Sequence, residues 1–296
     1  MAVRIAAAPI SWGVCEVPGW GKVLDREVVL GEMAELGLRA TELGPPGYLP
    51  TEPAELRAAL GTLRLVGGFY ATVLHDEQRQ ASSIAEATEL AELLASVGGE
   101  VLVLAAATGL TGYDERPALS AAEWRTLVET CALIRDAAAE HGLATVLHPH
   151  VGTHVERADE VARFVADSDL PLCLDTGHLL IGGADPVTLA REHPERIGHV
   201  HLKDVRADLA DRVRSGEISY TQAVAEGIYV PLGAGDVDLL AMLSSLSEVD
   251  YRGWYVLEQD TALPQDGTAD EDLPRRDTEQ SLARLHELLR ATGAEV

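Results

Sequence analysis

Ionisable side chains follow several short apolar runs of the sequence, at the point where each run ends. They are Glu42, His75, His148, His150, Asp175, His178, His201, Lys203, Asp204 and Glu258. If the runs are parallel strands of one closed sheet, their carboxyl ends meet on one rim, and these side chains come together there. Two imidazoles and two carboxylates on successive runs form a ligand set suited to Mn²⁺, Co²⁺, Zn²⁺ or Fe²⁺. The spacing therefore predicts a divalent-metal site made by His148, Asp175, His201 and Glu258.

The elements that must position these residues alternate along the chain. Eight β-type runs are predicted, at Arg4–Ile10, Arg39–Leu43, Val66–Leu74, Glu100–Ala106, Ala144–Leu147, Leu170–Leu174, Ile197–Leu202 and Trp254–Glu258. Between them, segments rich in Ala, Leu, Glu and Arg repeat apolar residues every three or four positions, which predicts helices. The helices are expected at about 26–36, 53–63, 84–97, 120–141, 157–166, 186–193, 236–246 and 278–291. Eight strand–helix units close a (β/α)8 TIM barrel, and we expect one such domain over residues 1–296.

An open, doubly wound sheet is the alternative to the barrel. It would carry a Gly-x-Gly-x-x-Gly turn after its first strand, whereas this chain has Pro9-Ile-Ser-Trp-Gly13 there. The barrel is therefore favoured. The helix at 120–141 has the clearest local signal, because Ser120 followed by Glu123 is typical of a capping box and Gly142 marks the end.

One segment, at about 205–235, interrupts the alternation after the seventh predicted strand. In a parallel barrel it falls on the face where the βα loops build active sites. We interpret it as a lid-like insertion. A surface excursion without a role in the site is the alternative.

The composition excludes several classes of protein. The chain has 296 residues, with 23 Lys and Arg against 48 Asp and Glu, and a formal charge of −25. Such a surface repels polyanions, so no nucleic-acid partner is expected. No run approaches the roughly 18 apolar residues of a membrane span, and no hydrophobic leader is visible. Three cysteines without Cys-x-x-Cys spacing suit a reducing compartment. We therefore expect a cytoplasmic protein without a membrane partner.

Several motifs resemble a known barrel family. Leu174-Asp-Thr-Gly-His178 precedes Gly198-His-Val-His-Leu-Lys-Asp204, and Pro231-Leu-Gly-Ala-Gly-Asp236 precedes Tyr251-Arg-Gly-Trp-Tyr-Val-Leu-Glu258. This pattern resembles the xylose-isomerase-like TIM barrels, which include sugar phosphate isomerases and epimerases. Three further segments are most similar to the inosose dehydratases of inositol catabolism. They are Ala8-Pro-Ile-Ser-Trp-Gly13, Glu42-Leu-Gly-Pro-Pro-Gly-Tyr-Leu-Pro50 and His148-Pro-His-Val-Gly-Thr153.

The resemblance implies roles for individual residues. It assigns metal binding to the four residues named above, with Mn²⁺ or Co²⁺ expected and Mg²⁺, Zn²⁺ or Fe²⁺ as alternatives. His178 would contact a small polyol or keto-sugar substrate. Isomerases and epimerases of the family have a glutamate where this chain has His148. This glutamate and the strand-eight glutamate exchange protons with opposite faces of one substrate carbon. That pair is incomplete here. Barrels of this family commonly pair, so a homodimer or homotetramer is expected.

The histidine at position 148 also changes the charge of the predicted site. Two carboxylates and two neutral imidazoles cancel a divalent ion, whereas three carboxylates and one imidazole leave a negative charge in excess. A neutral site is the stronger electrophile and favours an enolate next to a ketone. The charge therefore favours elimination of a hydroxyl group next to the enolate, the reaction of a carbon–oxygen lyase. Together with the resemblance, it implies a dehydratase that acts through a metal-stabilised enolate on a cyclic polyhydroxy ketone such as 2-keto-myo-inositol, an inosose.

The resemblance makes Glu258 a candidate catalytic residue as well as a ligand, because the family uses the strand-eight glutamate for proton exchange. Three further residues are candidates for proton transfer. His150 is the candidate base, because residues two apart on a strand project to the same side, and related 3-dehydroshikimate dehydratases are thought to use a histidine at this position. His150 could instead hydrogen-bond the nearby loop or replace His148 as ligand. Lys203 or Asp204 could act as the acid, orient a hydroxyl group, or form an ion pair at the strand end.

The remaining candidates are assigned to substrate binding. Trp12 could pack on a polyol ring, or lie in the core. Glu42 could accept hydrogen bonds from substrate hydroxyls, or orient a histidine. His75 and Arg206 complete this group.

Other functions are compatible with parts of the pattern. The same metal site could serve a keto-sugar isomerase or epimerase. A lyase variant would eliminate an alcohol from a 3-keto-glycoside through the same enolate. A metal-free binding protein would require the four-residue ligand set to be accidental.

Overall fold

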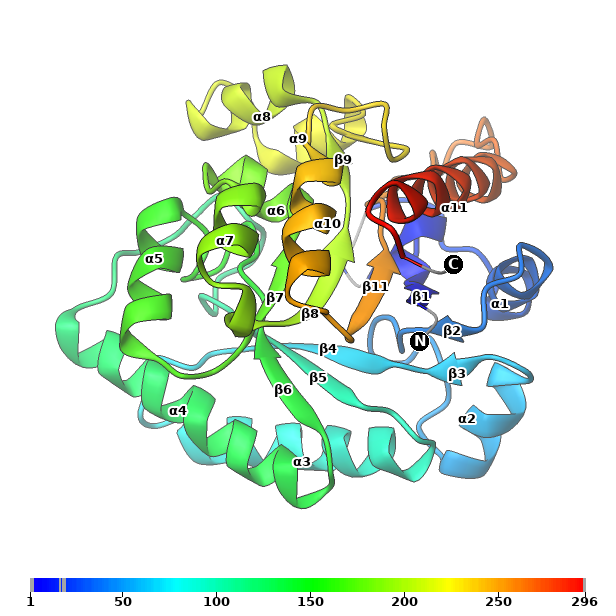
Figure 1. Cartoon of the computed structure of the whole chain (residues 1–296). Helices are drawn as coiled ribbons and strands as arrows, with labels where there is room; N and C mark the ends of the chain where they lie inside the picture. Colours follow the sequence, from blue (N-terminus) through cyan, green and yellow to red (C-terminus); the bar gives the residue numbers. More distant parts are fainter. Residues whose placement is uncertain (1–2, 16, 18–19, 295–296) are drawn as a thin grey trace.

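The computed structural model describes residues 3–15, 17 and 20–294. Nine parallel strand segments form one sheet in the order β3-β2-β1-β11-β8-β7-β6-β5-β4 (Figure 1). The segments are β1 Arg4–Ala7, β2 Ala40–Thr41, β3 Arg64–Leu65, β4 Gly67–Thr72, β5 Val101–Ala106, β6 Ala144–Leu147, β7 Leu172–Asp175, β8 Ile197–Leu202 and β11 Trp254–Leu257.

The two ends of this sheet are consecutive pieces of one strand. β3 pairs with β2, and β4 pairs with β5. Only Val66 separates β3 from β4 along the chain. Val66 N donates to Thr41 O at 2.9 Å, and Val66 O accepts from Val101 N at 3.1 Å. The eight predicted strands therefore close into a barrel, which confirms the predicted (β/α)8 fold class.

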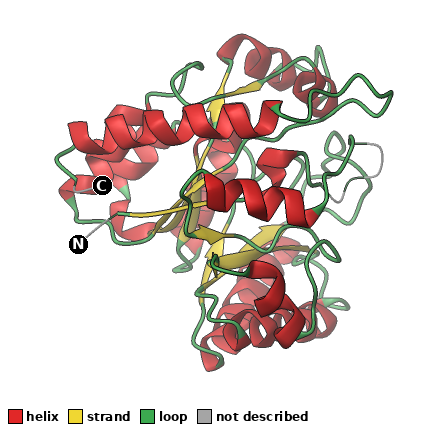
Figure 2. Cartoon of the chain, turned by 90° about the vertical axis from the view of Figure 1, so that its right-hand side faces the viewer, coloured by secondary structure: helices red, strands yellow, loops and turns green. Residues whose placement is uncertain are grey.

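Helices connect the strands and lie around the central sheet (Figure 2). They are α1 Arg26–Glu35, α2 Pro53–Leu60, α3 Gln80–Ser96, α4 Ala121–Glu140, α5 Ala158–Asp167, α6 Thr176–Gly182, α7 Pro186–Glu192, α10 Leu239–Glu248 and α11 Leu273–Ala291, with short 3-10 helices η1 Pro9–Trp12 and η2 Pro194–Arg196. The predicted capping box of α4 is present. Glu123 N donates to Ser120 Oγ at 3.3 Å, and Ser120 N donates to Glu123 Oε2 at 2.7 Å. Across the described ranges, no helix combines the length and the apolar character that crossing a membrane requires.

Several element bounds differ from the sequence prediction, and two of the differences lie next to the site. The first strand ends at Ala7 instead of Ile10, because Pro9 has no backbone N–H for a strand ladder and begins η1. Helix α6 is absent from the predicted elements, since seven residues are too few to show a helical repeat. It begins directly after β7, where the Asp175 side chain accepts hydrogen bonds from its first turn.

Apolar residues in and beside the barrel strands form two separate buried clusters. One is made of Ala6, Ala8, Ala40, Val66, Trp254 and Val256, and the other of Val101, Val103, Val146 and Cys173. Next to the first cluster, the Arg4 guanidinium lies 4.1 Å from the centre of the Trp254 ring and pairs with Glu100 at 2.5 Å.

The predicted insertion contains two short helices and a small antiparallel ribbon. They are β9 Asp204–Val205, α8 Ala207–Arg214, α9 Tyr220–Ala225 and β10 Tyr229–Val230. Helix α8 packs against α6 (Figure 1), and Arg214 Nη1 donates to Leu180 O at 2.6 Å. The insertion therefore contacts the helix that follows the carboxyl end of β7.

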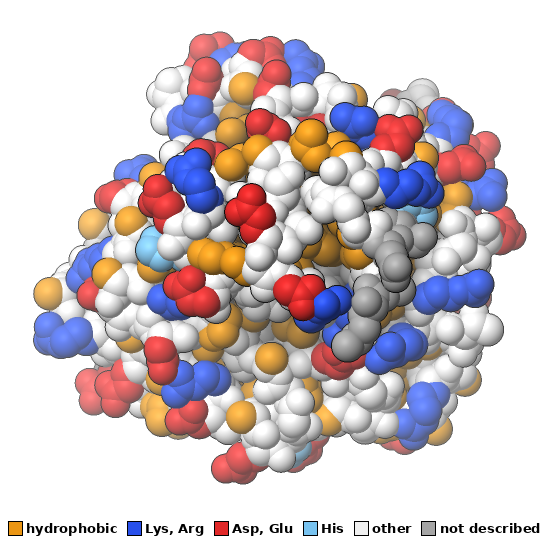
Figure 3. Space-filling view, viewed as in Figure 1, with side chains coloured by type: hydrophobic (Ala, Val, Ile, Leu, Met, Phe, Trp, Pro, Cys, Tyr) orange, Lys and Arg blue, Asp and Glu red, His pale blue; other side chains and the backbone are white. Residues whose placement is uncertain are grey.

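Charged side chains are mixed on the surface. On the face in Figure 3, acidic and basic groups are interspersed and do not form a patch of one sign. Exposed ion pairs such as Lys22 with Glu271, at 2.5 Å, likewise place opposite charges next to each other.

Candidate active site

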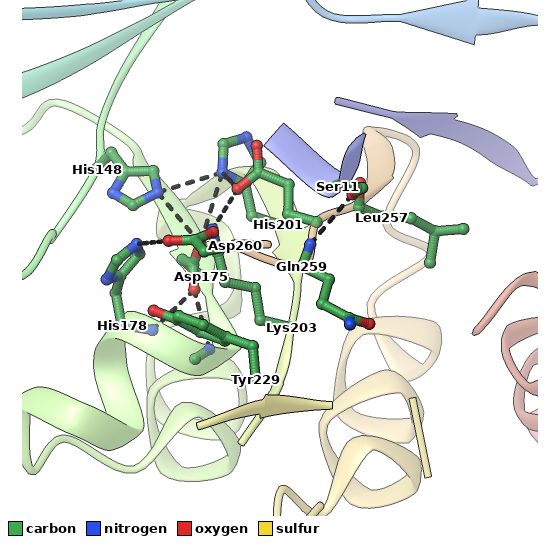
Figure 4. Close-up of polar contacts among 12 residues, drawn as sticks. Ser11, His148, Asp175, His178, His201, Lys203, Tyr229, Leu257, Gln259 and Asp260 are labelled. Carbon is green, nitrogen blue, oxygen red and sulfur yellow. Dashed lines mark hydrogen bonds and ion pairs between the residues drawn. The ribbon is translucent and has the colours of Figure 1, made fainter. Parts of the chain in front are cut away.

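Four side chains from four neighbouring strands converge at the carboxyl end of the barrel. His148 follows β6, Asp175 ends β7, His201 lies in β8 and Glu258 follows β11. His148 Nε2 lies 3.3 Å from Asp175 Oδ2 and 3.2 Å from His201 Nδ1. His201 Nδ1 lies 3.2 Å from Glu258 Oε2 and 3.6 Å from Asp175 Oδ2. The four residues that the sequence pattern brings together therefore meet in the fold, and Figure 4 shows three of them.

The two oxygens of Asp175 have different environments. Oδ1 accepts hydrogen bonds from Gly177 N at 2.9 Å and His178 N at 2.8 Å, and so caps α6. Oδ2 is buried, and no described residue donates a hydrogen bond to it. A buried carboxylate oxygen without a hydrogen bond is costly unless a cation compensates it. Asp175 Oδ2 thus faces the cluster, where its nearest charged neighbour is the Lys203 ammonium, with Nζ 3.3 Å away.

This donor set fits a divalent cation. Ligand atoms of Asp175, His201 and Glu258 lie within 4.8 Å of one another, as do those of His148, Asp175 and His178. Two imidazoles and two carboxylates suit first-row divalent metals. The cluster could therefore hold a metal ion, with His148, Asp175, His201 and Glu258 as its ligands.

Glu42 orients one of these histidines. Its Oε1 lies 3.2 Å from His201 Nε2 and 2.8 Å from His199 Nε2, and all three residues are buried. Burial alone would raise the pKa of Glu42, but the two histidines hold it well below its usual value. Because Glu42 accepts from Nε2 of His201, Nδ1 is the nitrogen that faces the cluster. Of the two predicted roles for Glu42, the contacts favour orienting a histidine.

Lys203 is buried between three carboxylates. Its Nζ lies 2.5 Å from Glu258 Oε2, 2.8 Å from Asp260 Oδ1 and 3.3 Å from Asp175 Oδ2. Burial alone would lower the pKa of Lys203, but the three carboxylates hold it well above its usual value. Burial likewise opposes the charged form of Glu258, yet His201 and Lys203 lower the pKa of that carboxyl to about 2. The site thus contains a buried ammonium group whose charge is balanced by carboxylates.

His150 lies beside the cluster as a neutral imidazole. Its Nδ1 is 2.7 Å from Val151 O and donates to it, which leaves the lone pair on Nε2. Burial and the neighbouring His148 and Lys203 lower the pKa of His150 to about 3. Its ring centre lies 3.8 Å from that of His178, so the two imidazoles stack. His150 is therefore in the form that can accept a proton.

A cavity of about 260 Å³ opens onto these groups. Its polar lining, called the polar wall below, includes His148, His150, Lys203, Glu258 and Asp260. Aromatic rings also line it, from Trp20, Phe69, Tyr70 and Tyr113. Apolar walls with a few convergent polar groups are typical of small-molecule sites.

Of the six predicted substrate-binding residues, Glu42 lines this cavity and the other five do not. His178 is buried and stacks on His150, which separates it from the lining, and Asp204 is described below. Trp12 is fully buried in the core, where its Nε1 donates to Glu32 Oε2 at 2.7 Å, and Trp20 lines the cavity instead. His75 packs against His154 with ring centres 4.4 Å apart. Arg206 is on the surface and pairs with Asp208. For these side chains the structure favours packing and surface roles over substrate contact.

The Asp204 carboxylate binds backbone N–H groups outside the cavity. Its Oδ2 accepts from Gly233 N at 2.7 Å and Gly235 N at 3.0 Å, and its Oδ1 accepts from Val205 N at 3.0 Å and Val237 N at 3.1 Å. A Cβ at position 235 would lie 2.3 Å from Asp204 Oδ1, which explains the glycine there. Asp204 therefore anchors a loop, and neither the predicted acid role nor a substrate contact fits these bonds.

We expect Asp204→Ala to lower the free energy of unfolding by about 2–4 kcal/mol, because it strands several backbone N–H groups without acceptors. Urea denaturation measures this change. Asp208→Ala, which removes an exposed carboxylate nearby, is the matched control and should change stability by less than about 0.5 kcal/mol. Equal stability of the two variants would contradict the anchoring role.

Three site residues are missing from the sequence prediction. His199 lies two positions before His201, and Asp260 lies two positions after Glu258, so the period of two along a strand could have identified both. Tyr220, in the insertion, donates its hydroxyl to Asp260 Oδ2 at 2.8 Å. No local pattern identifies Tyr220, because its partner is 40 residues away.

Comparisons with known proteins agree with this geometry. An inosose dehydratase of Geobacillus kaustophilus (strain HTA426) is 35% identical over 275 residues, which cover 88% of this chain and 89% of that protein. The rhizopine catabolism protein MocC of Rhizobium meliloti is 35% identical over 269 residues, which cover 87% of this chain and 82% of that protein. A solved L-ribulose 3-epimerase superposes with a TM-score of 0.70 at 16% identity, over 99% of this chain and 96% of that one, and shows the shared fold.

A family model matches most of the chain. It describes the xylose isomerase-like TIM barrel and covers residues 30–291. This match confirms the resemblance seen in the motifs that end the sixth, seventh and eighth barrel strands. The chain belongs to the xylose isomerase-like TIM barrel family.

Proposed function

We propose that the protein is a divalent-metal-dependent dehydratase that removes water from an inosose such as 2-keto-myo-inositol. The observation that carries the proposal is a neutral imidazole and an ammonium group that line one cavity beside the metal-binding cluster. A base and an acid of different kinds suit an elimination, which takes a proton from one carbon and a hydroxyl from the next. Relatives of similar length named inosose dehydratase support the substrate.

The cofactor is proposed to be Mn²⁺ or Co²⁺. His148, Asp175, His201 and Glu258 would hold it, and when bound it would act as a Lewis acid toward a ketone oxygen of the substrate. The two carboxylates balance its charge. Glu42 holds the His201 ring in place for this role.

The protein residues carry the proton transfers. Nε2 of His150 takes the proton from the carbon next to the ketone, and that electron pair forms the new carbon–carbon double bond. The neighbouring carbon–oxygen bond breaks, and the hydroxyl leaves as water with a proton from Nζ of Lys203. The enol product becomes a diketone, and proton exchange with solvent restores both residues. No oxidant or reductant is required.

The shape of the cavity supports a small cyclic substrate. Its volume of about 260 Å³ is near the lower limit of ligand pockets. The rings of Trp20, Phe69 and Tyr113 offer apolar faces to the C–H side of a polyol ring, while the hydroxyls meet the polar wall.

The experiment that tests the function uses Mn²⁺-loaded protein and 2-keto-myo-inositol in deuterated water. Ultraviolet absorbance and proton NMR are followed together. Growth of an enol or diketone chromophore with loss of water is the expected result. Deuterium uptake or a new epimer without absorbance would instead identify an epimerase. Release of an alcohol from a 3-keto-glycoside, with 2-keto-myo-inositol unchanged, would identify the related eliminase.

Removal of the metal should also lower the thermal stability. A ligand at a hundred times its Kd contributes about 2.7 kcal/mol, so we expect Mn²⁺ to raise the Tm of chelator-treated protein by about 5 °C or more. Differential scanning fluorimetry measures the shift. Ca²⁺, which prefers oxygen ligands, is the control for binding to the acidic surface. An equal shift with Ca²⁺ would argue against the mixed nitrogen and oxygen site.

A further inference from the structure

Asp260 is a buried carboxylate that connects Lys203 to the insertion. It lies two residues beyond Glu258 and is 9% exposed. Its Oδ1 is 2.8 Å from Lys203 Nζ, and its Oδ2 accepts the hydroxyl hydrogen of Tyr220 at 2.8 Å. Figure 4 shows Asp260 beside His178, whose Nε2 lies 3.9 Å from Asp260 Oδ2.

Asp260 differs from the other carboxylates around Lys203 because it is not a proposed metal ligand. Lys203 Nζ contacts three carboxylates, and two of these, Asp175 and Glu258, belong to the proposed metal ligands. A divalent cation would take both of them. Among the described residues, Asp260 is then the one remaining carboxylate within 4.0 Å of the ammonium group. An uncompensated ammonium beside a dication would repel it strongly in a buried site.

The insertion holds Asp260 from the other side. Tyr220 is 1% exposed, and its hydroxyl also lies 2.8 Å from the hydroxyl of Tyr229. The Tyr220 ring packs against Tyr113, with ring centres 5.1 Å apart, and Tyr113 lines the cavity. Tyr220 and Tyr229 both come from the insertion at about 205–235, so this segment reaches the polar wall of the site.

We propose that Asp260 is a positioning residue: it compensates and holds the Lys203 ammonium while Asp175 and Glu258 bind the metal ion, and Tyr220 holds Asp260 in place. This inference rests on the metal site of the proposed function. It assigns the insertion a contribution to the site that is independent of any closing motion.

A double-mutant cycle on Mn²⁺ affinity tests the role of Asp260 without any substrate. We expect Asp260→Asn to weaken Mn²⁺ binding about tenfold or more, although Asp260 is not a ligand, because Lys203 loses its remaining partner. Lys203→Met should bind Mn²⁺ at least as tightly as the unchanged chain. The double variant should recover the affinity that Asp260→Asn loses. Isothermal titration calorimetry measures all four proteins.

Two results of the cycle would overturn the proposal. One is unchanged affinity in Asp260→Asn, and the other is a double variant as weak as Asp260→Asn. Absence of Mn²⁺ binding by the unchanged chain would overturn it together with the metal site. A chain that binds Mn²⁺ but leaves 2-keto-myo-inositol unchanged would refute the proposed reaction, and the cycle would still decide the role of Asp260.

The role of Tyr220 is tested by Tyr220→Phe, which removes one hydroxyl. We expect turnover to fall about tenfold with KM changed less than about twofold. Deuterium exchange next to the ketone should continue, because His150 carries it out, whereas water loss needs a well-placed Lys203. The ratio of deuterium exchange to water loss should therefore rise. Tyr251→Phe is the matched control, because Tyr251 donates to Trp254 O at the other end of the barrel. If both variants keep the exchange ratio of the unchanged chain, Tyr220 does not position Asp260.

Discussion

The Asp175→Asn variant is expected to lose Mn²⁺ and turnover together. The substitution keeps an oxygen that can accept from Gly177 N and His178 N, so the cap of α6 remains. At the other position it replaces a carboxylate oxygen by an amide N–H₂, which points hydrogen atoms toward the cluster and removes a negative charge. We expect Mn²⁺ affinity to fall by more than about a hundredfold, beyond the effect of changing a residue that only orients a ligand.

Metal content after dialysis and kcat/KM on the inosose measure the two losses. Asp185→Asn is the matched control, because Asp185 also caps a helix, α7, by accepting from Val187 N at 3.0 Å, but it does so on the surface. The control should retain one equivalent of Mn²⁺ and full turnover. An Asp175→Asn protein that retained its Mn²⁺ would exclude Asp175 as a ligand.

The His150→Ala variant is expected to keep the metal and lose turnover. His150 Nδ1 donates to Val151 O, and its Nε2 is free to accept the substrate proton, so the alanine removes the base and leaves the four cluster residues in place. General-base catalysis contributes roughly a hundredfold to ten-thousandfold, and kcat should fall by that factor. Single-turnover absorbance measures the rate, and calorimetry measures Mn²⁺ affinity.

Added imidazole gives this test a second readout. The space left by the missing ring can admit a small base, so imidazole should restore part of the rate in His150→Ala and none in a variant that lacks a metal ligand. His193→Ala, a change at the end of α7 outside the cavity, is the control and should react like the unchanged chain. If His150→Ala lost its Mn²⁺, the assignment of His148 as ligand and His150 as base would be reversed.

The barrel is predictable because its signals are local. Each strand is a short apolar run and each long helix repeats apolar residues every three or four positions, so the order of elements follows from the chain alone. The Ser120 and Glu123 capping box depends on residues three apart. Helix α6 and the insertion ribbon are too short to leave such patterns, and they form because the barrel supplies partners such as Asp175 and Asp204.

The convergence of the four candidate ligands follows from the same local signals. Once His148, Asp175, His201 and Glu258 stand at the ends of neighbouring parallel strands, the closure of the barrel brings them together. The choice between alternatives for single residues is different. Trp12 and Trp20 both follow the first strand, but Trp12 is buried within η1, whereas Trp20 lines the cavity.

The sequence by itself therefore determined the barrel, the family and the four residues of the candidate metal-binding cluster, since each depends on the order of strands and on which residue ends each one. Only the tertiary structure decided which partners the neighbouring carboxylates bind. Asp204 accepts hydrogen bonds from four backbone N–H groups. Asp260 lies between Lys203 and Tyr220, which is 40 residues away in the sequence. Hydrogen bonds of this kind join segments that are distant in sequence, so their partners are set by packing and leave no trace in the local pattern.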